Sequence, residues 1–248
     1  MRISIVTLFP KMIEGFFAES IIKRAQEKGV INIELINLRE FAVDRYGSVD
    51  DKPYGGGAGM VMRVDVLHSA LEKIKTKNSH TILTSPKGTP FNQQKAKEFS
   101  KLDHLVLIAG HYEGVDERIL KDVNEEISLG DFVMTGGEIA VAAIVDSVAR
   151  LIPGVLKKED ATTNDSFFTT TIKHLIEVVG KNEILIGLQN KGAKEVTLLE
   201  YPHYTRPEEF QGKKVPEVLL SGNHAEIDDW RIKTAFEETL KKRPDLLK

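Results

Sequence analysis

One stretch in the middle of the chain constrains its fold more than any other. A short apolar run, Leu105–Ala109, predicts a buried strand that stops at Gly110. A second strand near Ile127–Leu129 also stops at a glycine, and a third turn, Thr135–Glu138, opens a helix. We expect the core side of this helix to carry Ile139, Ala142, Ala143, Val145 and Val148. In an open α/β sheet, such turns collect beyond the carboxyl ends of the strands, where ligands bind.

Glycine in these turns predicts a small-molecule pocket built largely from backbone, because a ligand can approach the main chain where no Cβ stands in the way. Neither GxxxxGKS/T nor GxGxxG occurs in the chain, so the two standard phosphate-binding loops are absent. Between residues 111 and 146, only Arg118 and Lys121 oppose nine carboxylates, which suits a positively charged ligand better than a polyphosphate. Most of these carboxylates are expected on solvated helix faces. Glu113 and Glu138, which lie inside turns, are the candidates for the site.

The flanking sequence continues the alternation of strands and helices. Residues 2–9 alternate as a strand, and Ile31–Asn37 and His80–Ser85 predict two more. A helix that starts at Pro10 carries an apolar stripe, which we interpret as core: Met12, Ile13, Phe16, Phe17, Ile21 and Ile22. About five strands alternating with helices predict an α/β protein with a mainly parallel sheet and helices on both faces.

A long connection, Leu38–Arg63, contains four glycines within five residues, at positions 55–59. Loops of this length without structure of their own are usually functional or mobile. From the residues alone, a hinge and a binding loop are equally open interpretations.

Composition excludes several classes of protein. The chain has no cysteine, which rules out disulfides, thiolate metal sites and thiol catalysis. The first residues predict a strand rather than a signal peptide, and the most apolar helix, Ile139–Ile152, is too short and too charged to span a membrane. We therefore expect a cytoplasmic protein with no membrane contact. The net charge of −3 indicates no basic domain, so an RNA-binding surface would have to be a local patch.

After Gly154 the alternating pattern ends. Residues 1–156 are therefore predicted to form the main domain, and residues 157–200 an interdomain linker that begins with a polar run. Within this linker, residues 168–197 contain a helical stretch and a short apolar run, which we interpret as a peripheral ordered insert. A small helical domain, residues 201–248, follows. A unit of this size buries little apolar surface unless it packs against a larger one. Its expected helices are Val215–Leu220 and Ile227–Leu240.

Six segments of the chain together resemble one family. They read PYGGGAGM, GHYEGVDER, SLGDFVMTGGE, DSVARLIPGVL, NDSF and YPHYTRP, and they span nearly the whole chain in the order of that family. In these segments the chain is similar to the bacterial tRNA (guanine-N1)-methyltransferases, members of the SPOUT class. The resemblance implies a deep trefoil knot in the C-terminal part of the main domain, with S-adenosylmethionine held there in a bent shape. Physical patterning would not predict a knot, because true knots are nearly absent from proteins.

The resemblance also implies roles for particular residues. The pocket for S-adenosylmethionine would be lined by Leu83, Ser85, Pro86, Gly110, Tyr112, Glu113, Ser128, Leu129, Gly130, Phe132, Met134, Gly136 and Gly137. The tRNA substrate would contact Tyr54, Gly55, Gly57, Gly59, Met60, His203, Tyr204 and Arg206. From their chemistry alone, the last three could equally bind RNA or form a rigid domain junction.

Two further expectations follow from the resemblance and concern assembly and metal content. One is a homodimer that joins each donor pocket to the linker and C-terminal domain of the other subunit. The other is a divalent cation, Mg2+, for which the sequence assigns no ligand.

Methylation of guanine N1 requires a base near N1 and a cationic or hydrogen-bonding group near O6, where negative charge builds as the N1 proton leaves. Asp165, in the predicted linker, suits the base, and desolvation on closure over RNA would raise its ordinary pKa of about 3.9 toward a better match. Arg150 suits the developing oxyanion because its guanidinium is always charged. By position alone, Arg150 is more readily a partner of the helix dipole, and the matched segments DSVARLIPGVL and NDSF favour the catalytic role.

One departure from the family pattern is the spacing after the DSF segment. The resemblance implies that LLEYPHYTRP follows after only a few residues, whereas residues 168–197 intervene here. Two other functions stay open: a SPOUT methyltransferase acting on another RNA, and a non-catalytic α/β RNA-binding module. The first would be expected to lack the YPHYTRP domain, and the second would lack the pair of a base and a cation.

Overall fold

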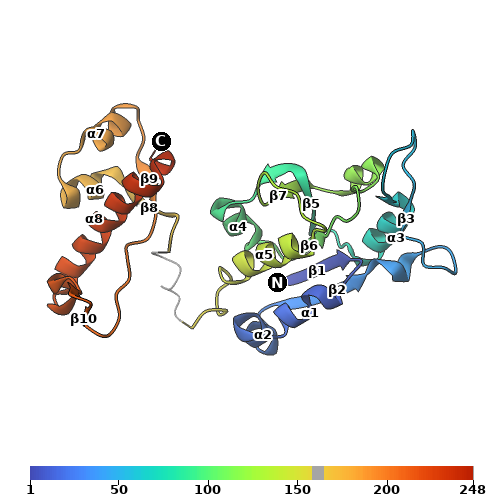
Figure 1. Ribbon diagram of the computed structural model, residues 1–248, viewed down its shortest axis with the longest axis horizontal. Coiled ribbons are helices and arrows are strands. Elements are labelled where there is room, and N and C mark those ends of the chain that lie inside the picture. Colours follow the sequence, from blue (N-terminus) through green and yellow to red (C-terminus); the bar gives the residue numbers. More distant parts are fainter. Residues whose placement is uncertain (158–164, 248) are drawn as a thin grey trace. The chain divides into compact units, whose positions relative to one another are not determined.

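The computed structural model describes residues 1–157 and 165–247. Contacts between residues divide the chain into two compact units, Met1–Lys157 and Lys158–Lys248 (Figure 1). Residues 158–164, which belong to the predicted linker, lie outside the described part.

The first unit is built on a five-stranded parallel sheet. Its strands are β1 (Arg2–Thr7), β2 (Asn32–Asn37), β5 (Ser79–Pro90), β6 (His104–Ile108) and β7 (Glu125–Ser128). They lie in the order β2-β1-β6-β5-β7, and every neighbouring pair is parallel. Parallel neighbours need a crossover connection, usually a helix, which explains the alternation along the sequence. The predicted α/β fold with a parallel sheet is confirmed.

Helices cover both faces of this sheet. One face shares a hydrophobic core with α1 (Lys11–Phe17), α2 (Ser20–Glu27), α4 (Gln93–Phe99) and α5 (Glu138–Ala149). The other face packs against α3 (Val64–Ile74) and two 3-10 helices, η1 (Leu38–Phe41) and η2 (Glu117–Asp122). Along β1, Ile3 and Ile5 face the first core and Val6 faces the second, because successive side chains of a strand point to opposite faces.

The apolar stripe near the N-terminus lies only partly in the core. Three of its residues are buried: Ile13, Phe17 and Ile22. The other three are exposed by 55%, 47% and 37%: Met12, Phe16 and Ile21. The helical conformation is interrupted between α1 and α2, where Ser20 has a φ of 56°. The two helices therefore do not form one continuous apolar stripe. The prediction that the whole stripe is core is therefore wrong, and Ile139, expected on the core side of α5, is likewise 58% exposed.

The glycine-rich connection projects from a short hairpin. β3 (Asp50–Asp51) and β4 (Val61–Met62) pair antiparallel, and the glycines lie in the loop between them. All four glycines have positive φ, at 86°, 80°, 130° and 83°. Other residues rarely adopt such angles, so this backbone path requires glycine.

The second unit combines short strands with helices. Its strands form two antiparallel pairs, β8 (Phe168–Thr171) with β9 (Glu195–Leu198) and β10 (Glu209–Phe210) with β11 (Lys213–Lys214). Its helices are α6 (Ile172–Val179), α7 (Glu183–Asn190), η4 (Glu217–Leu220), α8 (His224–Lys242) and η5 (Pro244–Leu246). Among the described residues, no helix is both long and apolar enough to cross a membrane.

The segment predicted to be a peripheral insert forms most of the core of this second unit. Six of the ten buried residues in that core come from it: Phe168, Ile172, Leu175, Leu185, Leu188 and Val196. They pack with Ala235 and Phe236 of α8. The prediction that this segment is peripheral is wrong. A lone C-terminal helix pair buries too little area to stand by itself, and residues 168–197 supply the surface that it needs.

Candidate functional site

A cavity of about 370 Å3 opens at the carboxyl ends of β5, β6 and β7. All thirteen residues predicted to bind S-adenosylmethionine line it: Leu83, Ser85, Pro86, Gly110, Tyr112, Glu113, Ser128, Leu129, Gly130, Phe132, Met134, Gly136 and Gly137. The structure thus brings four separate segments of the sequence around one space, at the edge of the sheet where α/β proteins bind ligands.

Hydrogen bonds of the Thr84 hydroxyl connect the walls of this cavity. This hydroxyl donates a hydrogen bond to Ile108 O at 3.1 Å and accepts one from Gly110 N at 3.2 Å. In turn, Gly137 N donates to Gly110 O at 2.6 Å. The middle of β5, the turn after β6 and the turn before α5 are therefore held at fixed distances from one another.

Glycine at position 137 is required by this packing. A Cβ there would lie 2.7 Å from Gly110 N and closer still to Thr84 Oγ1. The missing Cβ was expected to leave room for a ligand, but the Thr84 hydroxyl and the backbone of Ala109 and Gly110 fill that space. A substitution would therefore separate the walls of the pocket rather than merely narrow it.

Glu138 has a different position from the one expected. Its side chain is 1% exposed, accepts a hydrogen bond from Thr7 Oγ1 at 2.8 Å, and lies 3.6 Å from His111 Nδ1. It does not line the cavity, so the prediction that it belongs to the ligand site is wrong, and the physical reason is burial between β1 and the turn after β6. His111 does line the cavity, and its ring packs against Phe9 and Tyr112, with centroids 4.9 and 5.0 Å away.

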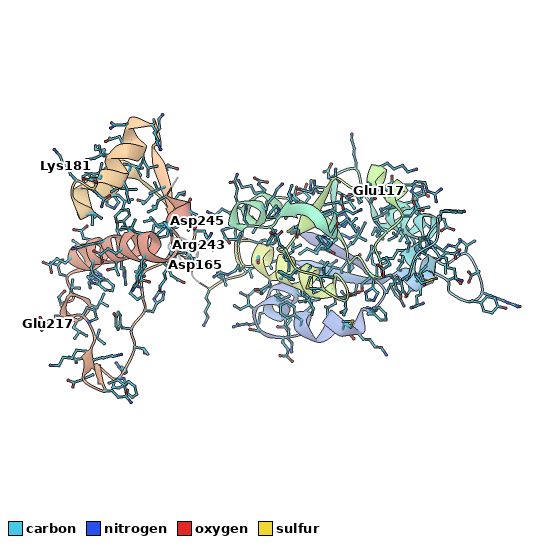
Figure 2. All side chains as sticks on the ribbon, turned by 45° about the horizontal axis from the view of Figure 1, so that its top comes forward. Glu117, Asp165, Lys181, Glu217, Arg243 and Asp245 are labelled. Atoms are coloured by element: carbon cyan, nitrogen blue, oxygen red, sulfur yellow. The ribbon has the colours of Figure 1, made fainter. Side chains whose placement is uncertain are left out.

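Most carboxylates of the acidic stretch have partners within the protein. Asp116 pairs with Arg118 at 2.7 Å, and this hydrogen bond lowers the pKa of Asp116. Burial alone would raise the pKa of Glu125, but hydrogen bonds from Lys95 and His80 outweigh burial and lower it. The carboxylates that line the cavity are Glu113, Glu117 and Glu126, and Glu117 is labelled in Figure 2.

The glycine-rich loop adjoins the cavity at Glu113. Glu113 N donates to Met60 O at 3.1 Å, and a Cβ on Gly59 would collide with the carboxylate of Glu113. Tyr54, Gly55 and Gly57 are exposed, and Tyr54 is fully so. Of the five loop residues predicted to contact substrate, two therefore contact the wall of the pocket and three project into solvent.

The predicted base and cation fall in different units. Arg150 is the residue that ends α5 in the first unit, at its carboxyl end. Asp165 begins the described part of the second unit, and its carbonyl accepts a hydrogen bond from Phe168 N at 3.1 Å. The neighbouring Ser166 is hydrogen bonded to Glu200, so Asp165 lies at the anchored start of a folded unit and not within a free linker. The pairing of Arg150 with Asp165 stays a prediction.

The C-terminal residues predicted to bind tRNA are all exposed. His203 Nε2 lies 3.1 Å from Glu200, and Tyr204 is 49% exposed. Both line a second, smaller hollow within the second unit, together with Trp230 and Arg231, whereas Arg206 does not line it. Trp230 and Arg231 were not predicted from the sequence to belong to a site. The only available signal was their position at the start of the last amphipathic helix.

Further residues that line the cavity of the first unit were also missed. They are Thr84, Gly114, Val115, Glu117, Leu120, Glu126, Ile127, Val133, Thr135 and Ala140. Most are direct neighbours of the predicted turns, so extending each turn by two or three residues would have found them.

A parallel α/β sheet with a pocket of glycine turns at its strand ends defines the class of enzymes that bind a nucleotide-like small molecule beyond the strands. Comparison with known proteins narrows this class. The whole chain, residues 1–248, matches the family described as tRNA (Guanine-1)-methyltransferase TrmD, and the chain belongs to that family.

Relatives from several bacteria are similar along the full chain, residues 168–197 included, so the expectation that this segment departs from the family spacing is wrong. A protein from Carboxydothermus hydrogenoformans named tRNA (guanine-N(1)-)-methyltransferase is 51% identical over 249 residues, covering 100% of this chain and 88% of its own length. Proteins of the same name from a Geobacter species and from Dictyoglomus turgidum are 50% and 47% identical, each covering 100% of this chain and 90% of their own length.

Proposed function

We propose that this protein transfers a methyl group from S-adenosylmethionine to N1 of a guanosine in tRNA, and that this guanosine is number 37, next to the anticodon. One observation carries the proposal: the thirteen residues expected to hold the donor converge on one cavity in a chain that belongs to this family. The residues fit such a group, because apolar and glycine-rich walls accept an adenosine, and the carboxylates Glu113, Glu117 and Glu126 outnumber Lys87, the one lysine or arginine among the lining residues.

S-adenosylmethionine supplies, when bound, an electrophilic methyl group on a positively charged sulfur. Pro86, Leu129 and Ile127 are apolar and suited to contact the adenine ring, while Glu113 and Glu126 provide negative charge at the same cavity. The walls are rigid because Thr84 and Gly137 tie them together. A rigid wall holds the donor without the cost of ordering a loop on binding.

Asp165 and Arg150 are proposed to handle the charge that develops on guanine. The N1–H bond breaks as the N1–methyl bond forms and the methyl–sulfur bond breaks. The N1 proton goes to the carboxylate of Asp165 and later to solvent. The electron pair of the N1–H bond stays on guanine for the new N1–methyl bond, and the electron pair of the methyl–sulfur bond stays on sulfur. Arg150 stabilises the negative charge that develops at O6 through its fixed guanidinium donors.

A divalent cation is implied by the resemblance, and the described residues do not form a complete set of ligands for one. Within 1–157 and 165–247, no group of three or more His, Asp or Glu side chains lies close enough to hold a metal ion. We therefore derive no step of the reaction through a metal.

A homodimer is proposed on the evidence of exposed apolar side chains on helices that contact each other. Met12 and Phe16 on α1 and Ile139 on α5 are 55%, 47% and 58% exposed, and α1 packs against α5. Exposed apolar groups gathered on neighbouring elements are typical of protein interfaces. The trefoil knot is also retained as a proposal, and membership of the family supports it.

Mapping the modified nucleotide tests the proposal directly. Unmodified tRNA transcripts incubated with the protein and labelled S-adenosylmethionine should gain one methyl group, at N1 of guanosine 37. Methylation of ribosomal RNA instead would favour the alternative of a SPOUT enzyme with another substrate. RNA binding without any transfer would favour the non-catalytic module.

A further inference from the structure

The second unit contains a hollow that the reaction described above does not use. It measures about 230 Å3, far above the roughly 10–15 Å3 that a single water molecule needs. Tyr201, Pro202, His203, Tyr204, Leu219, Ile227, Trp230 and Arg231 line it. The hollow therefore lies between the segment after β9, the 3-10 helix η4 and the first turns of α8.

Aromatic rings dominate this hollow. The centroids of Tyr201 and Trp230 are 6.4 Å apart, those of Tyr204 and Trp230 are 6.3 Å apart, and those of Tyr201 and His203 are 5.0 Å apart. Tyr204 is about half exposed and Trp230 is partly buried, so the rings are not closed off within a core. Rings that are held by one another and open to solvent form a surface on which another flat ring can stack.

Arg231 gives the hollow its polarity. Its guanidinium carbon lies 5.1 Å from the centroid of the Tyr201 ring, and its Nη1 donates to Asp228 at 3.0 Å. Its Nε is buried and has no hydrogen-bond partner among the residues that the structure describes. A buried donor without a partner is costly, so an acceptor that entered the hollow would be bound favourably.

This combination distinguishes between kinds of ligand. A methylated ammonium group also binds in aromatic cages, but Arg231 already places a positive charge on the Tyr201 ring and would repel it. An aliphatic side chain of a protein partner would leave the Arg231 donor unsatisfied. A nucleobase has both a flat face for stacking and ring acceptors for a guanidinium, and single-stranded RNA is recognised in this way.

We propose that the hollow formed by Tyr204, Trp230 and Arg231 binds an unpaired base of the tRNA substrate other than the guanine that is methylated. This inference rests on the proposed function, because it takes tRNA as the bound RNA. It assigns to the second unit a specific pocket for a base, beyond general contact with the RNA backbone.

Substitution of the rings tests the proposal through tRNA binding. Trp230→Ala and Tyr204→Ala should each weaken binding of an unmodified tRNA transcript about tenfold, since stacking of a base on an aromatic ring contributes about 1–3 kcal/mol. Trp230→Phe should retain most of the affinity because it keeps a ring. Arg231→Lys should fall between these, because an ammonium keeps the charge but loses the flat guanidinium. Phe210→Ala is the matched control, because Phe210 is 64% exposed in the same unit and lies outside the hollow.

Removal of single bases from the tRNA identifies the occupant. A set of transcripts is made, each with an abasic site at one unpaired position. One of them should bind the wild-type protein about tenfold more weakly than the intact transcript does. The same transcript should bind Trp230→Ala as strongly as the intact transcript binds that variant, because the lost base can no longer stack on Trp230. Trp230 is the only tryptophan in the chain, so its fluorescence should also be quenched by the intact transcript and not by that abasic one.

The outcomes separate this inference from the proposed function. If folded Tyr204→Ala and Trp230→Ala bind tRNA as the wild type does, or if no abasic position is coupled to Trp230, the pocket assignment is overturned. Should Trp230→Ala fail to fold, as shown by its melting curve, Tyr204→Ala takes its place in the cycle. Failure of the wild type to methylate tRNA that it nonetheless binds would overturn the proposed function and leave the base pocket standing.

Discussion

The two units of this chain build their sites by opposite means. In the first unit, backbone packs against backbone at the pocket, where Gly137 leaves no room for a Cβ between Thr84 and Gly110. In the second unit, the hollow is formed by large aromatic side chains, and the core under it comes mostly from residues 168–197. A pocket made from backbone leaves glycine motifs in a sequence, whereas a hollow made from side chains leaves only scattered aromatic residues.

The largest expected effect tests whether the first unit binds the donor without the second unit, while methyl transfer to tRNA requires both. Replacing residues 168–197 with a short polar linker should abolish methyl transfer to tRNA, because the second unit would lose six of the ten residues of its core. Binding of S-adenosylmethionine, measured by calorimetry, should stay unchanged, because every residue that lines the donor pocket lies in the first unit. Retained transfer would mean that the segment is peripheral after all. Lost donor binding would mean that the units are not separable.

Asp165 gives the next largest effect and tests whether the second unit contributes to the chemical step. Asp165→Asn keeps the shape of the side chain but removes the proton acceptor, so single-turnover transfer should fall about 10²–10⁴-fold with donor and tRNA binding nearly normal. Arg150→Lys should also slow transfer, because an ammonium cannot replace the guanidinium fork.

Asp245→Asn provides a matched control for this substitution. Asp245 belongs to the same unit, pairs with Arg243 at 2.7 Å, and is labelled together with Asp165 in Figure 2. The same chemical change there should leave the rate of transfer within about twofold of the wild type, because Asp245 pairs with Arg243 and is not proposed to accept the N1 proton. Wild-type transfer by Asp165→Asn would show that the base must be sought elsewhere, with Glu113 the next candidate.

Neighbouring residues of α7 test whether the second unit has a core of its own. Leu185 is fully buried, and Leu185→Ala should lower the free energy of unfolding of this unit by about 2–5 kcal/mol. Ile184 is 38% exposed, and Ile184→Ala should cost about 0.5 kcal/mol or less. Calorimetric or denaturant unfolding of both variants would show the contrast. Equal and small effects would argue that the buried position contributes little to the fold.

Gly137 tests the corresponding claim for the first unit. Gly137→Ala should destabilise that unit by about 1–3 kcal/mol, because the added methyl group forces Thr84 and Gly110 apart. Donor affinity should fall together with stability, since the same atoms form the pocket wall. Gly15→Ala is the control, because Gly15 lies in α1 with open space around the position of a Cβ. If Gly137→Ala melted as the wild type does, the backbone packing proposed for this turn would be wrong.

Much of the first unit could be predicted from the sequence because its patterns are local. Strands that stop at Gly110 and Gly130 and a helix that opens after Gly137 mark the edge of a parallel sheet, and the cavity lies there. What failed was the assignment of faces. Ile139 is exposed and Glu138 is buried, although an apolar side chain is usually buried and a charged one usually exposed. The buried carboxylate is stabilised by Thr7, which is remote in the sequence, and no local pattern reports that partner.

The second unit was harder to predict because its core joins distant segments. Ile172 and Leu175 pack with Phe236, more than half the length of the unit away, so residues 168–197 alone resemble an optional addition. The hollow beside Trp230 likewise combines residues from three elements. Only YPHYTRP, through its resemblance to a family, indicated that this part of the chain has a function.

The smallest expected effect is a dependence of stability on pH in the first unit. His104, at the start of β6, is 4% exposed and lies between Ser4 Oγ at 2.9 Å and Ser79 Oγ at 2.7 Å. Burial lowers its pKa, and the charge of Arg2 lowers it further. Below pH 6.5 the unfolded chain therefore binds a proton that the folded unit does not, so stability falls as pH drops from about 6.5, by at most about 1.4 kcal/mol per pH unit. His104→Gln should flatten the dependence between pH 7 and 5, which thermal unfolding at several pH values would measure. His68→Gln is the control, because His68 is 41% exposed at its side chain. An unchanged slope in His104→Gln would show that another group carries the dependence.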